Sequence, residues 1–182
     1  MLVISVVLLA VAIAIVGIYN SLVRLKVLTE NAWSVIGVQL KRRHDLIPNL
    51  VNTVEGYASH EKQTLQAVVD ARTQALLATG PAQSGQMEGQ LTQALKSIFA
   101  LAESYPQLRA SENFAELQTS LNQIEAAIQN ARRYYNAVVR DLNTKVAQFP
   151  SNIVAGLFKF EPKEFFELQQ GEEAVPEVKF SS

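Results

Sequence analysis

The stretch that decides the fold is residues 112–149, which read ENFAELQTSLNQIEAAIQNARRYYNAVVRDLNTKVAQF. Apolar side chains recur three and four residues apart, and Phe149 resumes the series after Phe114, Leu117, Leu121, Ile124, Ile128, Ala131, Tyr135, Val138 and Leu142. This heptad spacing predicts one long α-helix with a single apolar stripe, interrupted at Lys145. Ser111 is a candidate N-cap, and Glu112 places an acid where the helix dipole favours one.

The same period predicts helices on either side of this stretch. A long helix is expected over 21–78 and a short one over 151–158. Residues 86–105 repeat the pattern with Met87, Leu91, Ala94, Ile98, Leu101 and Tyr105. Residues 78–85 (ATGPAQSG) have the composition of a linker. Pro48 lies inside the long helix and predicts a kink there, because it removes a hydrogen bond to the His44 carbonyl. Asn49 or an arginine on a facing helix is a candidate donor to that carbonyl.

These segments predict an all-α fold in which an apolar N-terminal helix continues or leads into an antiparallel bundle of three to four long helices. We divide the chain into a membrane anchor (1–20), the bundle (21–168) and an acidic C-terminal tail (169–182). At a rise of ~1.5 Å per residue, the first helix is about 85 Å long and the second only about 30 Å. The short helix therefore leaves part of the first helix's apolar stripe uncovered, notably at Trp33, Ile36 and Leu40. We expect residues 151–168 or a second copy of the chain to cover it.

Residues 1–18 (MLVISVVLLAVAIAIVGI) are apolar apart from Ser5, and no charged side chain occurs before Arg24. A helix of about 20 such residues spans the hydrocarbon core of a bilayer. A cleaved signal peptide is disfavoured, because no cation precedes the run and its Ala-x-Ala triplets lie inside it. The cations all follow the run, so the positive-inside rule predicts an N-terminus outside and a bundle in the cytoplasm. We expect a single-pass protein of the bacterial inner membrane.

The predicted span also carries small residues on one helix face, at Ala10, Ala14, Gly17 and Ser21. Small residues let helices approach closely in lipid, so this face is a candidate for self-association. Alanine is also simply common in such spans, and the sequence leaves both interpretations open.

Signals for chemistry are weak. His60-Glu61 begins like a zinc protease motif, but position 64 is Thr instead of the second histidine. No Glu-x-x-His pair, phosphate-binding glycine loop or nucleophile elbow occurs, and the chain has no cysteine. We therefore expect no catalytic residues, no cofactor and no metal, and assign His44 and His60 structural roles.

Several polar residues at or near the apolar stripes predict a structural network that sets helix register. Arg43, Glu61 and Arg72 are its proposed members, with Pro48, Asn49, Arg132 and Asn136 as further structural positions. The alternative is that these groups form solvated helix faces with exposed ion pairs of ~0.3–0.5 kcal/mol each.

Charge excludes one class of partner. The net charge is −1, and residues 160–182 hold six glutamates against two lysines. The remaining cations are too few and too dispersed to indicate nucleic-acid binding. The tail is expected either to dock on a bundle or to fray.

Motifs throughout the chain resemble the bacterial LemA family. They are Trp33-Ser-Val-Ile-Gly-Val-Gln-Leu-Lys-Arg-Arg43, Asp45-Leu-Ile-Pro-Asn-Leu-Val51, Tyr57-x-x-His60-Glu61, Ala71-Arg72, Glu103-x-Tyr105-Pro106-x-Leu108, Asn113-Phe114, Ala131-Arg-Arg-Tyr-Tyr-Asn136, Phe149-Pro-Ser-Asn-Ile-Val-Ala155 and Pro176-x-Val178-x-Phe180. Gly37 departs from the acidic residue often found there. The resemblance implies a single-pass membrane protein with a helical bundle and no established enzymatic activity. One branch of the family is associated with magnetosome membranes.

The sequence therefore leads to two hypotheses of function. The first is a membrane-anchored, non-catalytic scaffold or adaptor that binds lipid, associates with itself and has an unidentified membrane or cytoplasmic protein partner. The second is a membrane-shaping or lipid-organising protein that uses the basic cluster Lys41–Arg43.

Overall fold

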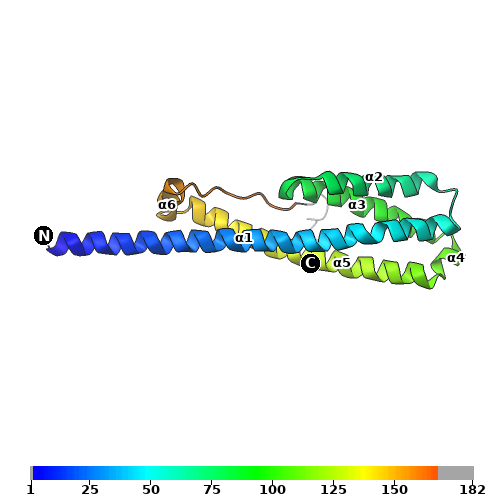
Figure 1. Cartoon of the computed structure of the whole chain (residues 1–182), viewed down its shortest axis with the longest axis horizontal. Coiled ribbons are helices and arrows are strands. Elements are labelled where there is room, and N and C mark those ends of the chain that lie inside the picture. Colours follow the sequence, from blue (N-terminus) through cyan, green and yellow to red (C-terminus); the bar gives the residue numbers. More distant parts are fainter. Residues whose placement is uncertain (1, 168–182) are drawn as a thin grey trace, which may run out of the picture. The chain divides into compact units, whose positions relative to one another are not determined.

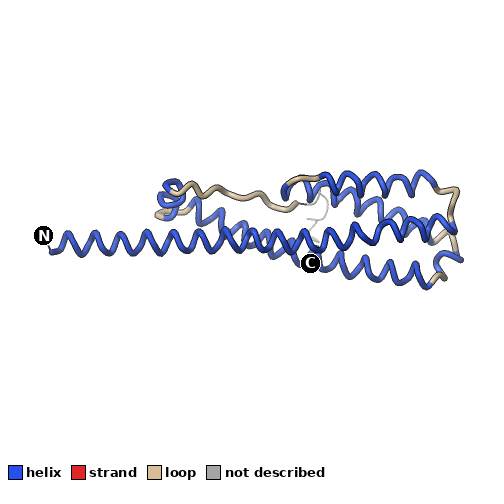
Figure 2. The backbone as a smooth tube through the Cα atoms, in the orientation of Figure 1, coloured by secondary structure: helices blue, strands red, loops and turns tan. Residues whose placement is uncertain are grey.

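The computed structural model describes residues 2–167, which form helices and connecting segments with no strand. In chain order the helices are α1 (Leu2–Tyr57), α2 (Lys62–Leu77), α3 (Gly80–Ala102), α4 (Pro106–Arg109), α5 (Glu112–Ala147) and α6 (Ser151–Leu157) (Figure 1). Residues 160–167 follow α6 without helical structure (Figure 2). The prediction of an all-α chain, with a long apolar N-terminal helix leading into a helical bundle, is confirmed. The tail predicted at 169–182 lies outside the described residues.

The chain divides into two compact units. The first unit comprises residues up to 45 together with 119–165, and the second comprises 46–118 together with the residues from 166 onward. α1 and α5 each contribute one part to both units.

The single long helix predicted over 21–78 is wrong, because the structure has two helices there. α1 ends at Tyr57, the chain turns through 58–61, and α2 begins at Lys62. The Ala58 amide closes the last turn of α1 on the Val54 carbonyl at 2.8 Å. No proline marks this break, but Gly56 and Ser59 are weak helix formers and the apolar stripe lapses between Ala58 and Leu65. α1 is continuous through Pro48, and the kink there remains a prediction.

The linker predicted over 78–85 is also wrong, because α3 begins at Gly80. Pro81 lies in the first turn of α3, where its missing N–H leaves no hydrogen bond unmade. The Gln83 side-chain oxygen accepts from the Thr79 amide at 2.9 Å and from the Thr79 hydroxyl at 3.1 Å. These residues therefore begin a helix, although their composition is typical of a linker.

In the first unit, α1 and α5 run antiparallel. Trp33 faces Tyr135 with ring centroids 5.6 Å apart, and Arg43 pairs with Glu125, so residue numbers rise along α1 as they fall along α5. The stripe predicted on α5 is confirmed at Phe114, Leu121, Ile124, Ile128, Tyr135, Val138 and Leu142, which are buried. Its last member is wrong: α5 ends at Ala147, and Phe149 lies beyond it with 75% of its surface exposed.

In the second unit, α2 and α3 pack as a helical hairpin (Figure 1). The buried face of α3 is rotated from the predicted one. Leu91 and Ile98 are buried as expected, but their neighbours in the core are Ser84, Glu88, Leu95 and Ala102 instead of Met87, Ala94 and Leu101. The prediction failed because this face includes a glutamate, which an apolar pattern excludes.

Candidate functional site

The first feature of the site is the apolar part of α1. Every side chain from Leu2 to Gly17 is exposed in the described structure, although most are aliphatic. α1 is the helix among residues 2–167 that is long and apolar enough to cross a membrane, and its apolar window is not buried against any other part of the chain. Aliphatic side chains exposed on all sides of a helix indicate a lipid environment, so this segment indicates membrane anchoring.

The small-residue face lies on this segment. Ala10, Ala14 and Gly17 are exposed and Ser21 is half-buried. A Cβ added at Gly17 would meet nothing within 4 Å. No other part of the described chain covers the face, and the prediction that it mediates self-association stays a prediction.

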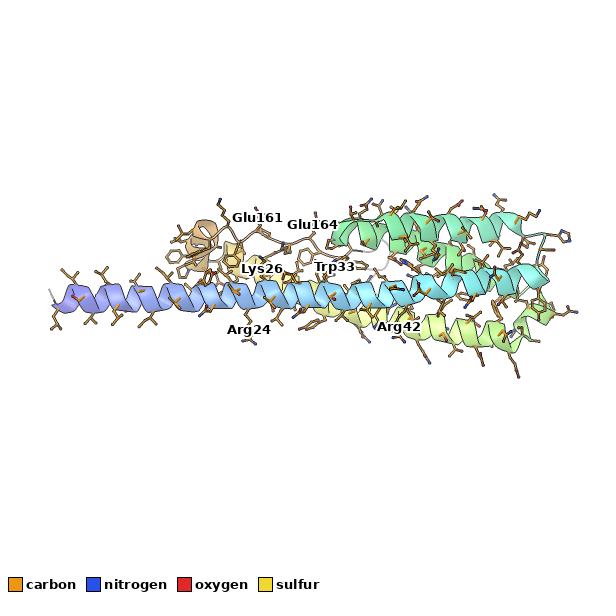
Figure 3. All side chains as sticks on the ribbon, in the orientation of Figure 1. Arg24, Lys26, Trp33, Arg42, Glu161 and Glu164 are labelled. Atoms are coloured by element: carbon orange, nitrogen blue, oxygen red, sulfur yellow. The ribbon has the colours of Figure 1, made fainter. Side chains whose placement is uncertain are left out.

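The open stripe predicted at Trp33, Ile36 and Leu40 is wrong. Ile36 and Leu40 are buried, and Trp33 is half-buried against the Tyr135 ring of α5. Figure 3 shows Trp33 on the side of α1 that faces the extended segment carrying Glu161 and Glu164, whereas Arg24 projects away from it. From the sequence, residues 151–168 or a second copy were expected to cover this stripe, because the short helix predicted over 86–105 covers only part of it. The chain covers the stripe itself.

The second feature is α6, which folds back against α1 and α5. Its inward side chains, Val154 and Ala155, form a buried cluster with Leu22 and Leu142, and Ile18, Leu25, Val146 and Phe160 pack around it. The Ser151 hydroxyl lies 2.6 Å from the Lys145 carbonyl and 2.8 Å from the Gln148 carbonyl, so it closes the turn between α5 and α6. α6 thus folds back on the bundle, but it packs at Leu22 and not over the stripe at Trp33, Ile36 and Leu40 that residues 151–168 were one candidate to cover.

Residues 160–165, called the strap, continue from α6 along α5 (Figure 2). The Tyr135 hydroxyl donates to the Glu164 carbonyl at 2.8 Å. Asn143 holds Lys163 from both sides: its amide group donates to the Lys163 carbonyl at 2.9 Å, and its carbonyl accepts the Lys163 amide at 2.8 Å. Burial, together with the Glu164 carboxylate, raises the pKa of Tyr135 to about 12. Two side chains of α5 thus fix the path of the strap.

The third feature is a buried ion pair. Arg43 is 4% exposed and pairs with Glu125 of α5 at 3.2 Å. Lys41 instead pairs with Asp45 at 2.6 Å on the surface, and Arg42 donates to Gln39 at 3.4 Å. Of the predicted basic cluster Lys41–Arg43, Lys41 and Arg42 are exposed, whereas Arg43 is buried in its pair with Glu125. Lipid binding therefore stays a prediction for Lys41 and Arg42 only.

In the second unit, Glu61 joins two turns of the chain. The Tyr105 hydroxyl, before α4, donates to the Glu61 carboxylate, before α2, at 3.0 Å. This hydrogen bond, followed by burial and the carboxylate charge, raises the pKa of Tyr105. Arg43 and Glu61 thus have partners that the sequence did not name, and a network joining them with Arg72 remains a prediction.

The remaining predicted structural positions have different environments. Arg72, Arg132 and Asn136 are half-buried and all interact with other groups. Pro48 and Asn49 are exposed, and the Asn49 carbonyl accepts the Thr53 hydroxyl at 2.8 Å. The donor to the His44 carbonyl stays a prediction.

The two histidines differ in burial: His44 is buried and His60 is exposed. Within residues 2–167, no three His, Asp or Glu side chains gather as a metal site would require. In the same range, every buried side-chain nitrogen or oxygen has a hydrogen-bond partner.

Several residues of these contacts escaped the sequence analysis. Glu125 and Glu88 sit at or beside the apolar stripes, where charge argues against burial. A glutamate beside an apolar stripe predicts a buried ion pair only when the facing helix, and the cation on it, are already known. Tyr105 was identified through the family motif, but its hydroxyl partner was not.

These observations define a class: a helical-bundle protein whose first helix is long and apolar enough to cross a membrane. Comparison with known sequences then gives the family. The chain belongs to the LemA family, whose sequence pattern matches residues 32–180, most of the chain. The matched region begins after the apolar run.

Named relatives agree with this family. The chain is 28% identical over 144 residues to Protein LemA of Metamycoplasma hominis, covering 77% of this chain and 64% of the relative. It is 26% identical over 175 residues to Magnetosome protein MamQ 2 of Paramagnetospirillum magneticum, covering 82% of this chain and 64% of the relative. For Magnetosome protein MamQ of Magnetospirillum gryphiswaldense the identity is 24% over 174 residues, covering 81% and 64%. The chain thus spans less than two thirds of the length of these relatives.

Proposed function

We propose that this chain is a single-pass membrane protein that acts as a non-catalytic scaffold or adaptor. α1 holds the bundle at the bacterial inner membrane, and the bundle binds a protein partner. The observation that carries the proposal is the contrast within α1: its apolar part, Leu2–Gly17, is exposed on every side, whereas Ile36, Ile47 and Leu50 further along are buried. One helix thus joins a lipid-compatible surface to a packed bundle.

The experiment is cross-linking of the full-length protein in native membranes, followed by purification. The proposal predicts a discrete set of cross-linked species that contain either a second copy or one reproducible partner. A persistent monomer without any co-purifying protein would count against it.

Self-association is assigned to the small-residue face of α1. Because the chain has no native cysteine, single cysteines report contacts cleanly. Ala14→Cys lies on the face and Ala12→Cys lies on the opposite side of the same helix. We expect oxidised dimers with Ala14→Cys and none with Ala12→Cys; equal cross-linking of the two variants would exclude this face.

Orientation is proposed with the N-terminus outside, from the cations that follow the span. Val38 is exposed on α1, and Val38→Cys should react with a membrane-impermeant maleimide only after the inner membrane is opened. Reaction in intact spheroplasts would reverse the orientation.

A second candidate is a membrane-shaping or lipid-organising role. The similarity to proteins named as magnetosome proteins favours it. It predicts that vesicles carrying the full-length protein change shape as protein density rises. Unchanged vesicles at high density would exclude it.

A further inference from the structure

α6 is apolar on both faces. Val154 and Ala155 point inward to the cluster on α1 and α5. On the outward face, Ile153 is 62% exposed and Leu157 is 72% exposed, and Phe149 and Phe158 beside them are 75% and 49% exposed. Four large apolar side chains of one short segment, residues 149–158, are thus exposed.

The outward face of α6 does not have the composition of a helix face in contact with water. Outward positions of α5 carry polar side chains, including Asn122, Gln123, Gln129 and Arg140, as expected for a helix that faces solvent. By contrast, no charged side chain occurs between Lys145 and Lys159, the whole length of the turn into α6, α6 itself and its end. The segment is an uncharged apolar tip bounded by two lysines.

The depth of the tip matches the end of the apolar part of α1. Arg24 is the first charged side chain after the apolar run, so the part of α1 suited to hydrocarbon ends close to Leu22. α6 packs against Ile18, Leu22 and Leu25, and the Tyr19 ring lies 4.7 Å from the Phe158 ring and 5.8 Å from the Phe160 ring between centroids. Aromatic side chains concentrate at this depth of membrane proteins, between hydrocarbon and water.

We propose that the tip formed by residues 149–158 is a second membrane contact, which inserts its outward face into the interfacial layer of the bilayer that α1 crosses. Phe149, Ile153, Leu157 and Phe158 enter the acyl-chain boundary, while Lys145 and Lys159 stay at the phosphate level, where lysine side chains extend toward the headgroups. α1 and the tip then fix the first unit to the membrane at two points. This inference requires α1 to span, and it does not depend on the scaffold role.

The other candidate occupant is a second copy of the chain. A stable interface between copies buries about 800 Å² on each partner, contributed by about 20–30 residues. Four side chains, two on the seven-residue helix α6 and two flanking it, fall well short of that, whereas they suffice for an interfacial insertion that is already held by a neighbouring span.

The test uses the cysteine-free full-length protein in lipid nanodiscs with single nitroxide-labelled cysteines. Ile153→Cys and Leu157→Cys probe the tip, Val11→Cys is the control inside the span, and Val38→Cys is the exposed control further along α1. Collision of each label with oxygen, which concentrates in lipid, is compared with collision with a water-soluble nickel complex. Circular dichroism of each labelled variant checks folding, which these exposed positions should not disturb.

We expect the ratio of oxygen to nickel accessibility at 153 and 157 to exceed the ratio at 38 several-fold and to approach the ratio at 11. If 153 and 157 match 38 while 11 reports lipid, α1 spans without the tip inserting and the inference is overturned. If labels at 153 and 157 are shielded from both reagents and show dipolar broadening that disappears on dilution with unlabelled protein, a second copy covers the tip, and the inference is overturned equally. Water accessibility at 11 would contradict both the insertion and the anchoring on which the proposed function rests.

Discussion

The first part of α1, residues 2–17, and α5 are both regular and helical, yet their side-chain surfaces are opposite in kind. The α1 segment is aliphatic on all sides and no side chain of it is buried. α5 buries one stripe, from Phe114 to Leu142, and exposes polar residues elsewhere. Both helices satisfy their backbone hydrogen bonds internally, so the difference lies only in the side chains and in what surrounds them. Equal substitutions at packed and exposed positions test this difference directly.

The largest effect is expected for a leucine. Leu142→Ala removes a side chain that is fully buried at the α1–α5–α6 cluster and should lower the free energy of unfolding by about 2–5 kcal/mol. Leu9→Ala, in the exposed part of α1, should leave it unchanged. Chemical denaturation in detergent measures both. Equal losses would mean that Leu9 packs in the folded protein.

A charge comparison comes next. Glu125→Ala removes the carboxylate that faces the buried guanidinium of Arg43, and the loss should be about 1–3 kcal/mol, because a buried charged donor loses one of its acceptors. Asp45→Ala breaks the exposed pair with Lys41 and should cost at most about 0.5 kcal/mol. Thermal unfolding of the two variants side by side is the measurement. A larger loss of stability for Asp45→Ala would contradict the conclusion that Arg43–Glu125 is the buried pair and Lys41–Asp45 the exposed one.

Two glycines should respond with opposite signs. A Cβ at Gly85 would come within 2.8 Å of the Glu167 carbonyl carbon, whereas one at Gly37 meets nothing within 4 Å. Gly85→Ala should therefore destabilise by about 1–3 kcal/mol through overpacking against backbone. Gly37→Ala should stabilise by about 0.5–1 kcal/mol, because alanine suits an exposed helix position better. Stabilisation by both would show that the chain near Glu167 moves aside without cost.

The two adjacent tyrosines of α5 provide a finer comparison. Tyr135→Phe removes the hydrogen bond to the Glu164 carbonyl that holds the strap and should cost about 0.5–1.5 kcal/mol. Tyr134→Phe changes a side chain that is 54% exposed and serves as the matched control. Limited proteolysis of the strap should accelerate only in Tyr135→Phe. Unchanged proteolysis would assign the strap's position to Asn143 alone.

The last comparison is a pH dependence. The pKa of Tyr135 is raised to about 12 in the folded chain, against about 10 when unfolded. The folded state therefore favours the neutral phenol, and the resulting stabilisation is fully present below about pH 10 and disappears as the pH approaches about 12. Between about pH 10 and pH 12, the free energy of unfolding should fall more steeply with pH for Tyr134→Phe, which keeps Tyr135, than for Tyr135→Phe. Identical slopes would remove Tyr135 as their source.

Prediction from the sequence succeeded where a pattern repeats over many residues. The α5 stripe and the exposed apolar part of α1 were both anticipated, because hydrophobic period and length are local properties of the chain. It failed at the turn 58–61 and at Gly80, where one helix ends or begins within a few residues. A proline was interpreted as a breaker at Pro81, where it initiates a helix, and no strong breaker marks Ala58. Single-residue capping decides such boundaries, and composition describes it poorly.

The sequence by itself determined that the chain is helical, that its first helix suits a bilayer, and that α5 buries one face, since each follows from the order of apolar and polar residues. Only the tertiary structure decided which face of α3 is buried, that Arg43 faces Glu125, and that α6 covers Leu22 while presenting Ile153 and Leu157 outward. These outcomes depend on pairs of residues far apart in the sequence. A buried charge is stable only through the group that faces it, and folding brings that group into place, whereas an exposed apolar side chain is explained by the surface that meets it.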